Sequence, residues 1–376
     1  MKPEKKFEFS EVINIQTVQK IGTSIQKVWA DFEVKKLEQK VKPQLSSLAF
    51  KDRATLIAEA LHELLPDDFG IAGQILLDSF GSELENPDFA GAHAFMYMPH
   101  GVYVSRYGLE EEHFDLSTRF LYAMTKRFSA EFAIRPFLDK FPQKMLQKLQ
   151  TWVTDESQHV RRLVSEGTRP RLPWASRVRV YDDNYLVIMD LLRTLRNDPE
   201  LYVRRSVANH LNDLTKDRKD LVLEHLTAWN KAPNKNIDWL TKHALRTLVK
   251  AGDAGALKIL GFSGNPQVEL LNFELEQPQI KLGEKLVFSF DLQSLVEEKQ
   301  ALVIDYSIYF KKSNGKQSPK VFKLKVLELD GGKLVQLQKK QTLQQLSTRI
   351  LYEGMHAVEL QINGKTFGKK AFELVF

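Results

Sequence analysis

The stretch "TWVTDESQHVRRLVSE" (Thr151–Glu166) decides the fold of this chain because the chain contains it more than once. A second copy, "TLRNDPELYVRRSVAN" (Thr194–Asn209), follows 43 residues later, with Asp155 aligned to Asp198 and the two "VRR" triplets coincident. In a looser third copy, 37 residues further on, "WLTKHALRTL" lies under "YVRRSVANHL". Helical repeats of about 40 residues are typical of HEAT-like solenoids, in which each helix pair buries its apolar face against the next pair. The repeats therefore predict a stack of helix pairs.

The second copy also predicts where its helix begins. In "NDPELYVRR", Asp198 is the expected N-cap and Pro199 the first helical residue, since both types are favoured at those positions. By alignment, Asp155 caps the matching helix and Glu156 occupies its first turn, with Trp152 in the turn before it.

Apolar periodicity extends the helical prediction over residues 1–264. "RATLIAEALHELL" repeats its apolar residues at helical spacing and is ended by Pro66, and "AGQILLDSFG" follows. "STRFLYAMTKRFSAEFAIRPFLDKF" supplies two further apolar stripes. "GVYVSRYG" (Gly101–Gly108) is expected to be an aromatic loop or a short helix.

After residue 264 the apolar period changes from helical to two. "KLVFSFDLQ" places Leu286, Phe288, Phe290 and Leu292 on one face, and "VIDYSIYFKK" and "VFKLKVLEL" alternate in the same way. "SNGK", "LDGGK" and "INGKT" are expected hairpin turns. About seven short strands predict an immunoglobulin-like sandwich. The predicted fold is therefore mainly α: a HEAT-like α-solenoid domain at residues 1–264, followed by an all-β immunoglobulin-like sandwich at 265–376.

Composition narrows the classes of function. The 376 residues include no Cys, which excludes disulfides, thiolate metal sites and Cys nucleophiles, and suits a cytoplasmic protein. The beginning of the sequence lacks the apolar run of a signal peptide, and no transmembrane stretch is evident. HExxH, GxSxG, P-loop and GxGxxG motifs are absent, so we expect no metal, no cofactor and no nucleotide cofactor.

Arginine is concentrated where the repeats lie. Of the 18 Arg, 16 fall between Arg106 and Arg246, and the net charge is +6. Arginine binds phosphate in a bidentate manner, so a basic groove that holds nucleic acid is one interpretation. The alternative is that about half of these side chains cap helices or pair with acids within the fold.

Trp152 and Glu156 also have two interpretations. As a site, they place an indole beside a carboxylate that the helix dipole keeps ionised. As structure, the tryptophan belongs to the core and the acid merely complements the dipole.

Several of these motifs together resemble one family. "VRRLVSEGTRPRLPW" (Val160–Trp174), "YVRRSVANHLNDLTKD" (Tyr202–Asp217), "WLTKHALRTLVKAG" (Trp239–Gly252) and "RFSAEFAIRPFL" (Arg127–Leu138) are similar to the HEAT-like-repeat alkylpurine DNA glycosylases. The match is to the AlkC branch, including members with an added immunoglobulin-like C-terminal domain. The resemblance implies a bacterial DNA repair enzyme that hydrolyses the N-glycosidic bond of cationic alkylated bases, above all 3-methyladenine, in double-stranded DNA without flipping the base.

The resemblance also implies site residues. The sister AlkD branch carries Trp-x-x-x-Asp, and the matching positions here are Trp152 and Glu156, which we expect to be catalytic. AlkD has a Trp where this chain has His243, which puts a stacking role there in doubt. The residues expected at the DNA are Arg161, Arg162, Arg169, Arg171, Trp174, Arg204, Arg205, Trp239, His243 and Arg246.

Other questions remain open at this point. The competing class is a non-catalytic HEAT scaffold that binds nucleic acid or protein, since a fold does not fix a function. Among lesions, 3-methylcytosine and 1-methyladenine are further candidates. A second acid such as Glu110, Glu111, Glu112 or Asp115 is a candidate assistant. We expect a monomer that makes no membrane contact, with the sandwich giving extra DNA contact.

Overall fold

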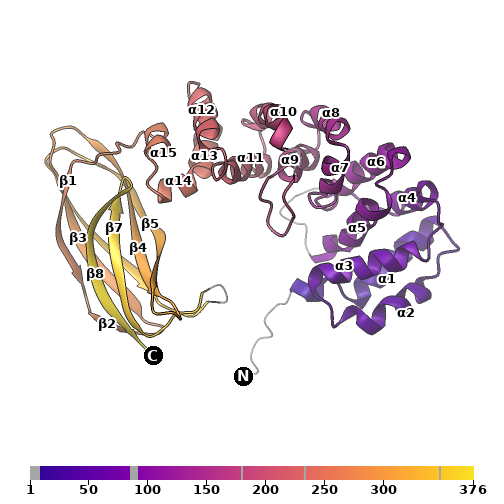
Figure 1. Ribbon diagram of the computed structural model, residues 1–376, viewed down its shortest axis with the longest axis horizontal. Helices are drawn as coiled ribbons and strands as arrows, with labels where there is room; N and C mark the ends of the chain where they lie inside the picture. The colour runs from indigo at the N-terminus through magenta and orange to yellow at the C-terminus, as the bar shows by residue number, and fades with distance from the viewer. Residues whose placement is uncertain (1–8, 85–91, 179–180, 233, 347–348) are drawn as a thin grey trace. The chain divides into compact units, whose positions relative to one another are not determined.

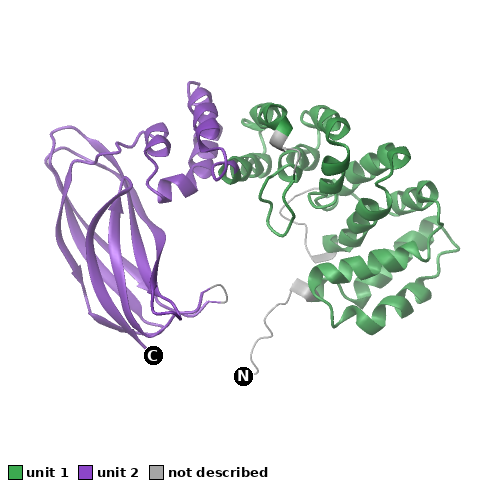
Figure 2. Cartoon of the chain, viewed as in Figure 1, with its two compact units in different colours: residues 1–213 green, residues 214–376 purple. Residues whose placement is uncertain are grey.

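The computed structural model describes residues 9–84, 92–178, 181–232, 234–346 and 349–376. The chain forms two compact units, Met1–Asp213 and Leu214–Phe376, which Figure 2 colours separately and which are described here one at a time. Helices come first and strands last along the chain (Figure 1), so the predicted fold class is confirmed. Among the described residues, no helix has the length and apolar character needed to cross a membrane.

The first unit consists of helices. Its α-helices are α1 (Ile15–Val28), α2 (Val34–Leu45), α3 (Phe50–His62), α4 (Phe69–Asp78), α5 (Met98–Tyr107), α6 (Phe114–Thr125), α7 (Arg135–Lys140), α8 (Pro142–Trp152), α9 (Gln158–Gly167), α10 (Tyr181–Leu195) and α11 (Leu201–Leu214). Short 3-10 helices are η1 (Phe9–Val12), η3 (Ala92–Tyr97) and η4 (Glu111–His113). Gly101–Gly108, expected as a loop or short helix, lies mostly in α5.

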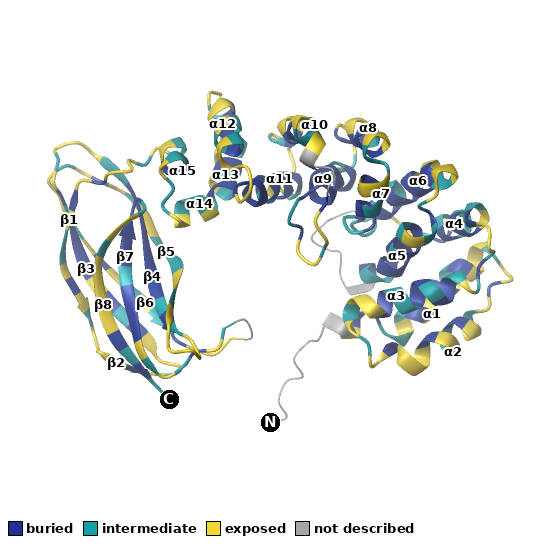
Figure 3. Ribbon diagram, viewed as in Figure 1, coloured by how far each residue is buried: buried dark blue, intermediate teal, exposed yellow. Residues whose placement is uncertain are grey.

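Each helix buries one apolar stripe against its neighbours. In α1 the buried residues are Val18, Ile21 and Ile25, and the Asn14 side chain caps the helix by accepting from Thr17 N at 3.1 Å. In α9 they include Val160, Leu163 and Val164, and Figure 3 shows such buried faces along the stack of helices. Burial of these stripes, rather than intrinsic propensity, holds helices of this length in place.

The 43-residue spacing of the sequence recurs in the boundaries of four helices. Helix α8 ends at Trp152 and α10 at Leu195, and α9 begins at Gln158 and α11 at Leu201, so both boundaries recur at a spacing of 43 residues. Two successive helix pairs therefore share one local design.

The predicted helix starts are wrong by two residues. Helix α11 begins at Leu201, so Asp198 and Pro199 precede it, and Asp198 Oδ1 accepts from Glu200 N at 2.9 Å. In the equivalent turn, Asp155 Oδ1 accepts from Ser157 N at 2.8 Å, and α9 begins at Gln158. Each aspartate thus closes a turn two residues long instead of capping the helix. Glu156 consequently lies in a loop and not in a first helical turn.

The second unit combines helices and strands. Its helices are α12 (Lys219–Trp229), α13 (Lys235–Ala244), α14 (Arg246–Lys250) and α15 (Ala254–Ile259). Its strands are β1 (Val268–Leu275), β2 (Gln279–Lys281), β3 (Lys285–Ser294), β4 (Gln300–Lys311), β5 (Gln317–Leu329), β6 (Leu334–Thr342), β7 (Gly354–Ile362) and β8 (Lys365–Val375). They form one sheet in the order β1-β3-β6 and another in the order β2-β8-β7-β4-β5.

The alternate apolar side chains of β3 and β4 point into the core of the sandwich, as predicted. Leu286, Phe288, Phe290 and Leu292 of β3 are at most 1% exposed, and they belong to one cluster with Ile304, Tyr306 and Ile308 of β4. In β5, Phe322 and Leu324 pack against this cluster but Val326 is 46% exposed, so the alternation fails at that end of the strand.

The helices of the second unit pack against the sandwich. A Cβ placed on Gly252 would lie 2.7 Å from Gly364 Cα, so the two backbones touch at positions with positive φ that favour glycine. Asn363 Nδ2 donates to Ser263 O at 2.9 Å, and Gln361 Nε2 donates to Lys250 O at 3.2 Å. The predicted boundary at 264/265 falls between α15 and β1, whereas the compact units divide at Asp213/Leu214.

Candidate active site

A polar cavity of about 490 Å³ opens in the first unit beside the loop between α8 and α9. Its lining includes four acids, Glu83, Asp155, Glu156 and Glu200, and two permanent cations, Lys126 and Arg161. Leu84, Tyr122, Ser157, Gln158 and His159 complete the lining. The acids outnumber the cations, so the cavity favours a positively charged occupant.

Two neighbouring carboxylates lie in the α8–α9 loop and are held differently. Asp155 accepts from Tyr122 Oη at 2.9 Å through Oδ2, while its Oδ1 accepts from Ser157 N. Glu156 is exposed and its carboxylate has no hydrogen bond or ion pair among the residues that the structure describes. Asp155 is therefore fixed, and Glu156 is free to approach a ligand.

Arg161, in the first turn of α9, holds this loop through hydrogen bonds to its backbone. Its Nη1 donates to Asp155 O at 2.8 Å and to Glu156 O at 2.9 Å, and its Nε and Nη2 donate to the two Asp198 oxygens at 2.6 and 3.1 Å. The bond with Asp198 raises the pKa of Arg161. The equivalent Arg204 donates from Nη1 to Asp198 O at 2.5 Å and to Pro199 O at 2.8 Å. Both arginines therefore bind backbone carbonyls that a phosphate would have to replace.

Two aromatic side chains, Tyr122 and Trp152, pack together next to the loop. Trp152, the last residue of α8, is only 8% exposed and packs against Tyr122 with ring centroids 5.8 Å apart. Lys126 Nζ lies 4.6 Å from the Tyr122 ring centroid and 3.5 Å from Glu83 Oε1. Desolvation and the bond to Asp155 raise the pKa of Tyr122, so its hydroxyl stays protonated and donates. Trp152 thus supports the site as part of the core.

The chain is similar over nearly its whole length to two known proteins. The Pseudomonas fluorescens alkylpurine DNA glycosylase AlkC, solved bound to DNA containing an abasic site analog, superposes with a TM-score of 0.90 and 34% identity over 98% of this chain and 100% of that chain. The protein named "Uncharacterized protein YhaZ" from Bacillus subtilis (strain 168) is 31% identical over 368 residues, covering 98% of this chain and 99% of that protein. The chain belongs to the AlkC family. Residues 269–376 also match the family described as "Uncharacterised protein YhaZ, C-terminal Ig-like domain".

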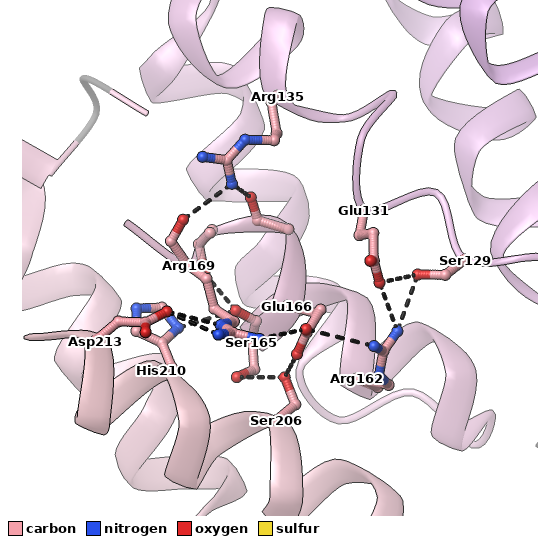
Figure 4. Close-up of polar contacts among 12 residues, drawn as sticks. Ser129, Glu131, Arg135, Arg162, Ser165, Glu166, Arg169, Ser206, His210 and Asp213 are labelled. Carbon is pink, nitrogen blue, oxygen red and sulfur yellow. Dashed lines mark hydrogen bonds and ion pairs between the residues drawn. The ribbon is translucent and has the colours of Figure 1, made fainter. Parts of the chain in front are cut away.

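This AlkC-family chain also buries a network of charges between its helices (Figure 4). Glu166, which is 5% exposed, pairs with Arg169 at 2.7 Å and Arg162 at 3.5 Å and accepts from Ser206 Oγ at 2.5 Å. Arg162 also pairs with Glu131 at 2.9 Å, and Arg169 with Asp213 at 2.9 Å. Burial opposes ionisation of Glu166, but the two guanidiniums outweigh it and lower its pKa. Arg162 and Arg169 are thus structural ion-pair partners rather than free phosphate ligands.

Other residues expected at the DNA have different surroundings. Arg205 is exposed, Arg171 is half-buried, and Trp174 is 64% exposed with a φ of 67° and its carbonyl bound by Lys51. In the second unit, Trp239 and His243 stack with centroids 4.9 Å apart, and Arg246 Nη1 donates to His243 O at 2.6 Å. Arg179, at the end of the arginine-rich stretch, lies outside the described residues.

The suggested assisting acids lie away from the cavity lining. Glu110 and Asp115 pair with Lys140 and Lys148, and Glu111 pairs with Lys144. Glu112 is 3.6 Å from His113. The acids that line the cavity with Glu156 are Glu83, Asp155 and Glu200. The sequence predicted a role for only one of these three, Asp155, as a helix cap. Glu83 and Tyr122 are distant in sequence from Glu156, so no local spacing could have identified them.

His159 is the remaining titratable group of the cavity. It is 7% exposed, its ring meets Tyr202 edge-on at 5.7 Å, and burial lowers its pKa, so it is neutral at physiological pH. A neutral imidazole does not repel a cationic occupant. No group of His, Asp or Glu among the described residues is arranged to hold a metal ion. The chemistry available from these side chains is electrostatic stabilisation of a cation and orientation of water.

Proposed function

We propose that this protein is an alkylbase DNA glycosylase that hydrolyses the N-glycosidic bond of cationic alkylated bases in double-stranded DNA. The observation that carries the proposal is the acid-rich cavity, in which the unpaired carboxylate of Glu156 lies beside the fixed carboxylate of Asp155. The AlkC family relationship supports the same reaction, since the related Pseudomonas enzyme was solved with abasic-site DNA.

Glu156 is the proposed catalytic residue. A base alkylated on its ring, such as 3-methyladenine, 3-methylcytosine or 1-methyladenine, already carries positive charge and leaves without a strong general acid. The sugar then develops oxocarbenium character, which an ionised carboxylate stabilises and to which it can direct a water molecule. At about 4 Å and an effective dielectric of about 20, this attraction amounts to about 4 kcal/mol, or roughly a thousandfold in rate.

The same electrostatics give selectivity without base flipping. An undamaged neutral base gains nothing from the surplus of negative charge in the cavity, whereas a cationic base is attracted to it. The polar, open character of the lining suits a nucleotide that remains stacked in the duplex. Trp152 then supports the loop from behind through its contact with Tyr122, since little of the indole is exposed for direct contact with the sugar.

DNA is held, in this proposal, by arginines other than those that brace the fold. Arg205, which was predicted at the DNA, is exposed in the first unit and stays a candidate for phosphate contact, and the exposed Arg177 is a further candidate. Arg161, Arg162, Arg169 and Arg204 act through internal bonds. Trp239, His243 and Arg246 stay candidates in the second unit, where the sandwich adds DNA contact.

The test uses purified protein and methylated duplex DNA, with released bases identified by chromatography. We expect release of 3-methyladenine by the wild type, and a loss of about a thousandfold in single-turnover rate for Glu156→Gln with DNA affinity retained. Glu112→Gln is the matched control, because Glu112 is an exposed acid outside the cavity. If Glu156→Gln released bases at the wild-type rate, Glu156 would have no catalytic role. If the wild type bound DNA but released no base, the chain would be a scaffold.

A further inference from the structure

A second cavity, of about 310 Å³, lies within the second unit where α14 and the chain after α15 cover the sandwich. Its apolar lining consists of Val249, Leu260, Phe262, Val303 and Val326, and its charged lining of Lys242, Arg246, Lys250, Asp305 and Lys323. Apolar walls with a few convergent charged groups are typical of small-molecule sites of about this volume.

The floor of this cavity is the outward face of β4. Ile304 and Tyr306 point into the sandwich core, so Val303, Asp305 and Ser307 point the other way, yet they are only 3–6% exposed. The helices that cover this face are tied to the sheet by Gln361 and Asn363. The cavity is therefore built into the packing of the unit.

Asp305 is the distinctive group on that floor. It lies beside a bulge in the pairing of β4 with β5, is 3% exposed, and has no side-chain hydrogen bond or ion pair among the described residues. Burial raises its pKa to about 6, although Lys323 and Lys250 oppose the shift. A largely buried carboxylate that accepts no hydrogen bond from the protein is destabilised in its ionised form. A ligand that brings N–H donors would remove that cost.

The rim carries the opposite charge. Lys242, Lys250 and Lys323 are exposed, and Arg246 lies among them, so four cations surround one carboxylate. This balance repels a cationic ligand and favours one with an anionic group such as phosphate. The ligand must therefore combine N–H donors, a flat or apolar body and a negative end.

We propose that this cavity binds a guanine nucleotide. Guanine presents two adjacent N–H donors on one edge, which match the two oxygens of the Asp305 carboxylate, whereas adenine does not. Phe262 and the valines contact the base, and the lysines bind the phosphate. The nucleotide comes either free from solution or from the end of a DNA strand. This inference uses no residue of the first cavity, and only Arg246 of its lining is also a candidate for DNA contact in the proposed function.

Calorimetric titration of the full chain with GMP, guanosine, AMP and inorganic phosphate tests the proposal. We expect GMP to bind most tightly, guanosine more weakly for want of a phosphate, and AMP at least about tenfold more weakly. Asp305→Asn should weaken GMP and guanosine alike by about tenfold or more, because the amide offers a donor where an acceptor is needed. Base release from methylated DNA should be unchanged in this variant.

Exposed lysines provide the second arm. Lys323→Gln should weaken GMP but leave guanosine unaffected, whereas Lys325→Gln, two residues along the same strand and outside the cavity, should change neither. This comparison holds even if Asp305→Asn fails to fold. The proposal is overturned if GMP gives no saturable binding at millimolar concentration, or if Lys323→Gln weakens GMP and guanosine equally. If a single DNA strand ending in deoxyguanosine monophosphate displaces GMP, the ligand is the end of a DNA strand. If that strand does not displace GMP, the ligand is the free nucleotide.

Discussion

Two adjacent carboxylates with different degrees of freedom define the chemistry of the α8–α9 loop. Asp155 is held by Tyr122 and by a backbone amide, whereas Glu156 beside it has no partner among the described residues. In the proposed mechanism the two acids have different tasks. The fixed Asp155 contributes negative potential to the cavity, and the unpaired Glu156 moves close to the positive charge that develops on the sugar. The hydroxyl of Tyr122 then matters because it fixes the direction of Asp155.

Tyr122→Phe tests this positioning role. Loss of one hydrogen bond to a carboxylate should lower the single-turnover rate of base release by about tenfold and the free energy of unfolding by about 1 kcal/mol. Affinity for methylated duplex should be unchanged, since the hydroxyl donates its hydrogen bond to Asp155. An unaltered rate of release would mean that the orientation of Asp155 is irrelevant to catalysis.

Arg161 and Arg205 should respond in opposite ways to substitution. Arg161→Lys cannot keep both carbonyl contacts and both Asp198 contacts, so the loop loosens and release should slow by about tenfold with little change in DNA affinity. Arg205→Gln, at an exposed position, should weaken DNA binding and lower its salt dependence by about 0.9 in the log–log slope, with the rate on bound DNA maintained. Binding titrations at several salt concentrations and single-turnover assays distinguish the two. A reduced salt slope for Arg161→Lys would contradict its assignment as a positioning residue.

Among the helices, the repeat joins neighbouring pairs through buried charge. Glu166 of α9 is shared by two arginines and accepts from Ser206 of α11, so α9 and α11 are bonded inside the stack. Removing one member of a buried ionic group leaves the others uncompensated. Loss of any one member of this network should therefore destabilise the packing of α9 against α11.

Glu166→Gln should lower the free energy of unfolding at neutral pH by about 3 kcal/mol. Because the folded-state pKa of Glu166 is depressed, its contribution is fully present above the ordinary carboxylate value of 4.5 and is lost as the pH falls through the folded-state pKa. The difference between wild type and variant should therefore shrink in acid. Urea unfolding at neutral pH and at a pH below the ordinary carboxylate value measures this difference in the free energy of unfolding. The control Glu112→Gln should change the free energy of unfolding by less than about 0.5 kcal/mol. A difference that grew in acid would rule out an ionised Glu166 in the fold.

Periodicity predicted the elements well and their polar contacts poorly. The 43-residue repeat predicted the spacing of successive helix pairs, and this spacing recurs in the ends of α8 and α10 and in the starts of α9 and α11, because burial of apolar stripes follows spacing along the chain. The helix starts were misplaced because an aspartate can close a two-residue turn as readily as it caps a helix.

The sequence could not predict the partners of the polar side chains, because these partners are distant along the chain. An arginine pairs equally well with phosphate and with a buried acid. Arg161 pairs with Asp198, 37 residues away, and Arg162 pairs with Glu131, 31 residues away. Tyr122, which is 33 residues from Asp155, carries no motif at all. Glu156 was identified by family resemblance, and the structure adds that it lines an acid-rich cavity.

The three predicted hairpin turns of the sandwich have different surroundings. Asn363–Gly364 packs against Gly252 and Ser263, so it serves the second unit internally. Asp330 lies 3.5 Å from Lys299, in contact with its own sandwich. The turn at Asn314–Gly315 is exposed and flanked by Lys312 and Lys316, which makes it the turn best suited to a phosphate backbone.

Lys312→Gln combined with Lys316→Gln in the full chain tests this contact without exposing the packed face that truncation would uncover. Each lost phosphate contact should reduce the slope of log affinity against log salt by about 0.9, so the double variant should show a clearly shallower salt dependence. Release from DNA that is already bound should be unaffected, because the turn lies in the sandwich and the cavity residues belong to the first unit. Lys340→Gln, an exposed lysine within β6, is the control for net charge alone. An unchanged slope in the double variant would assign the sandwich a role other than DNA contact at this turn.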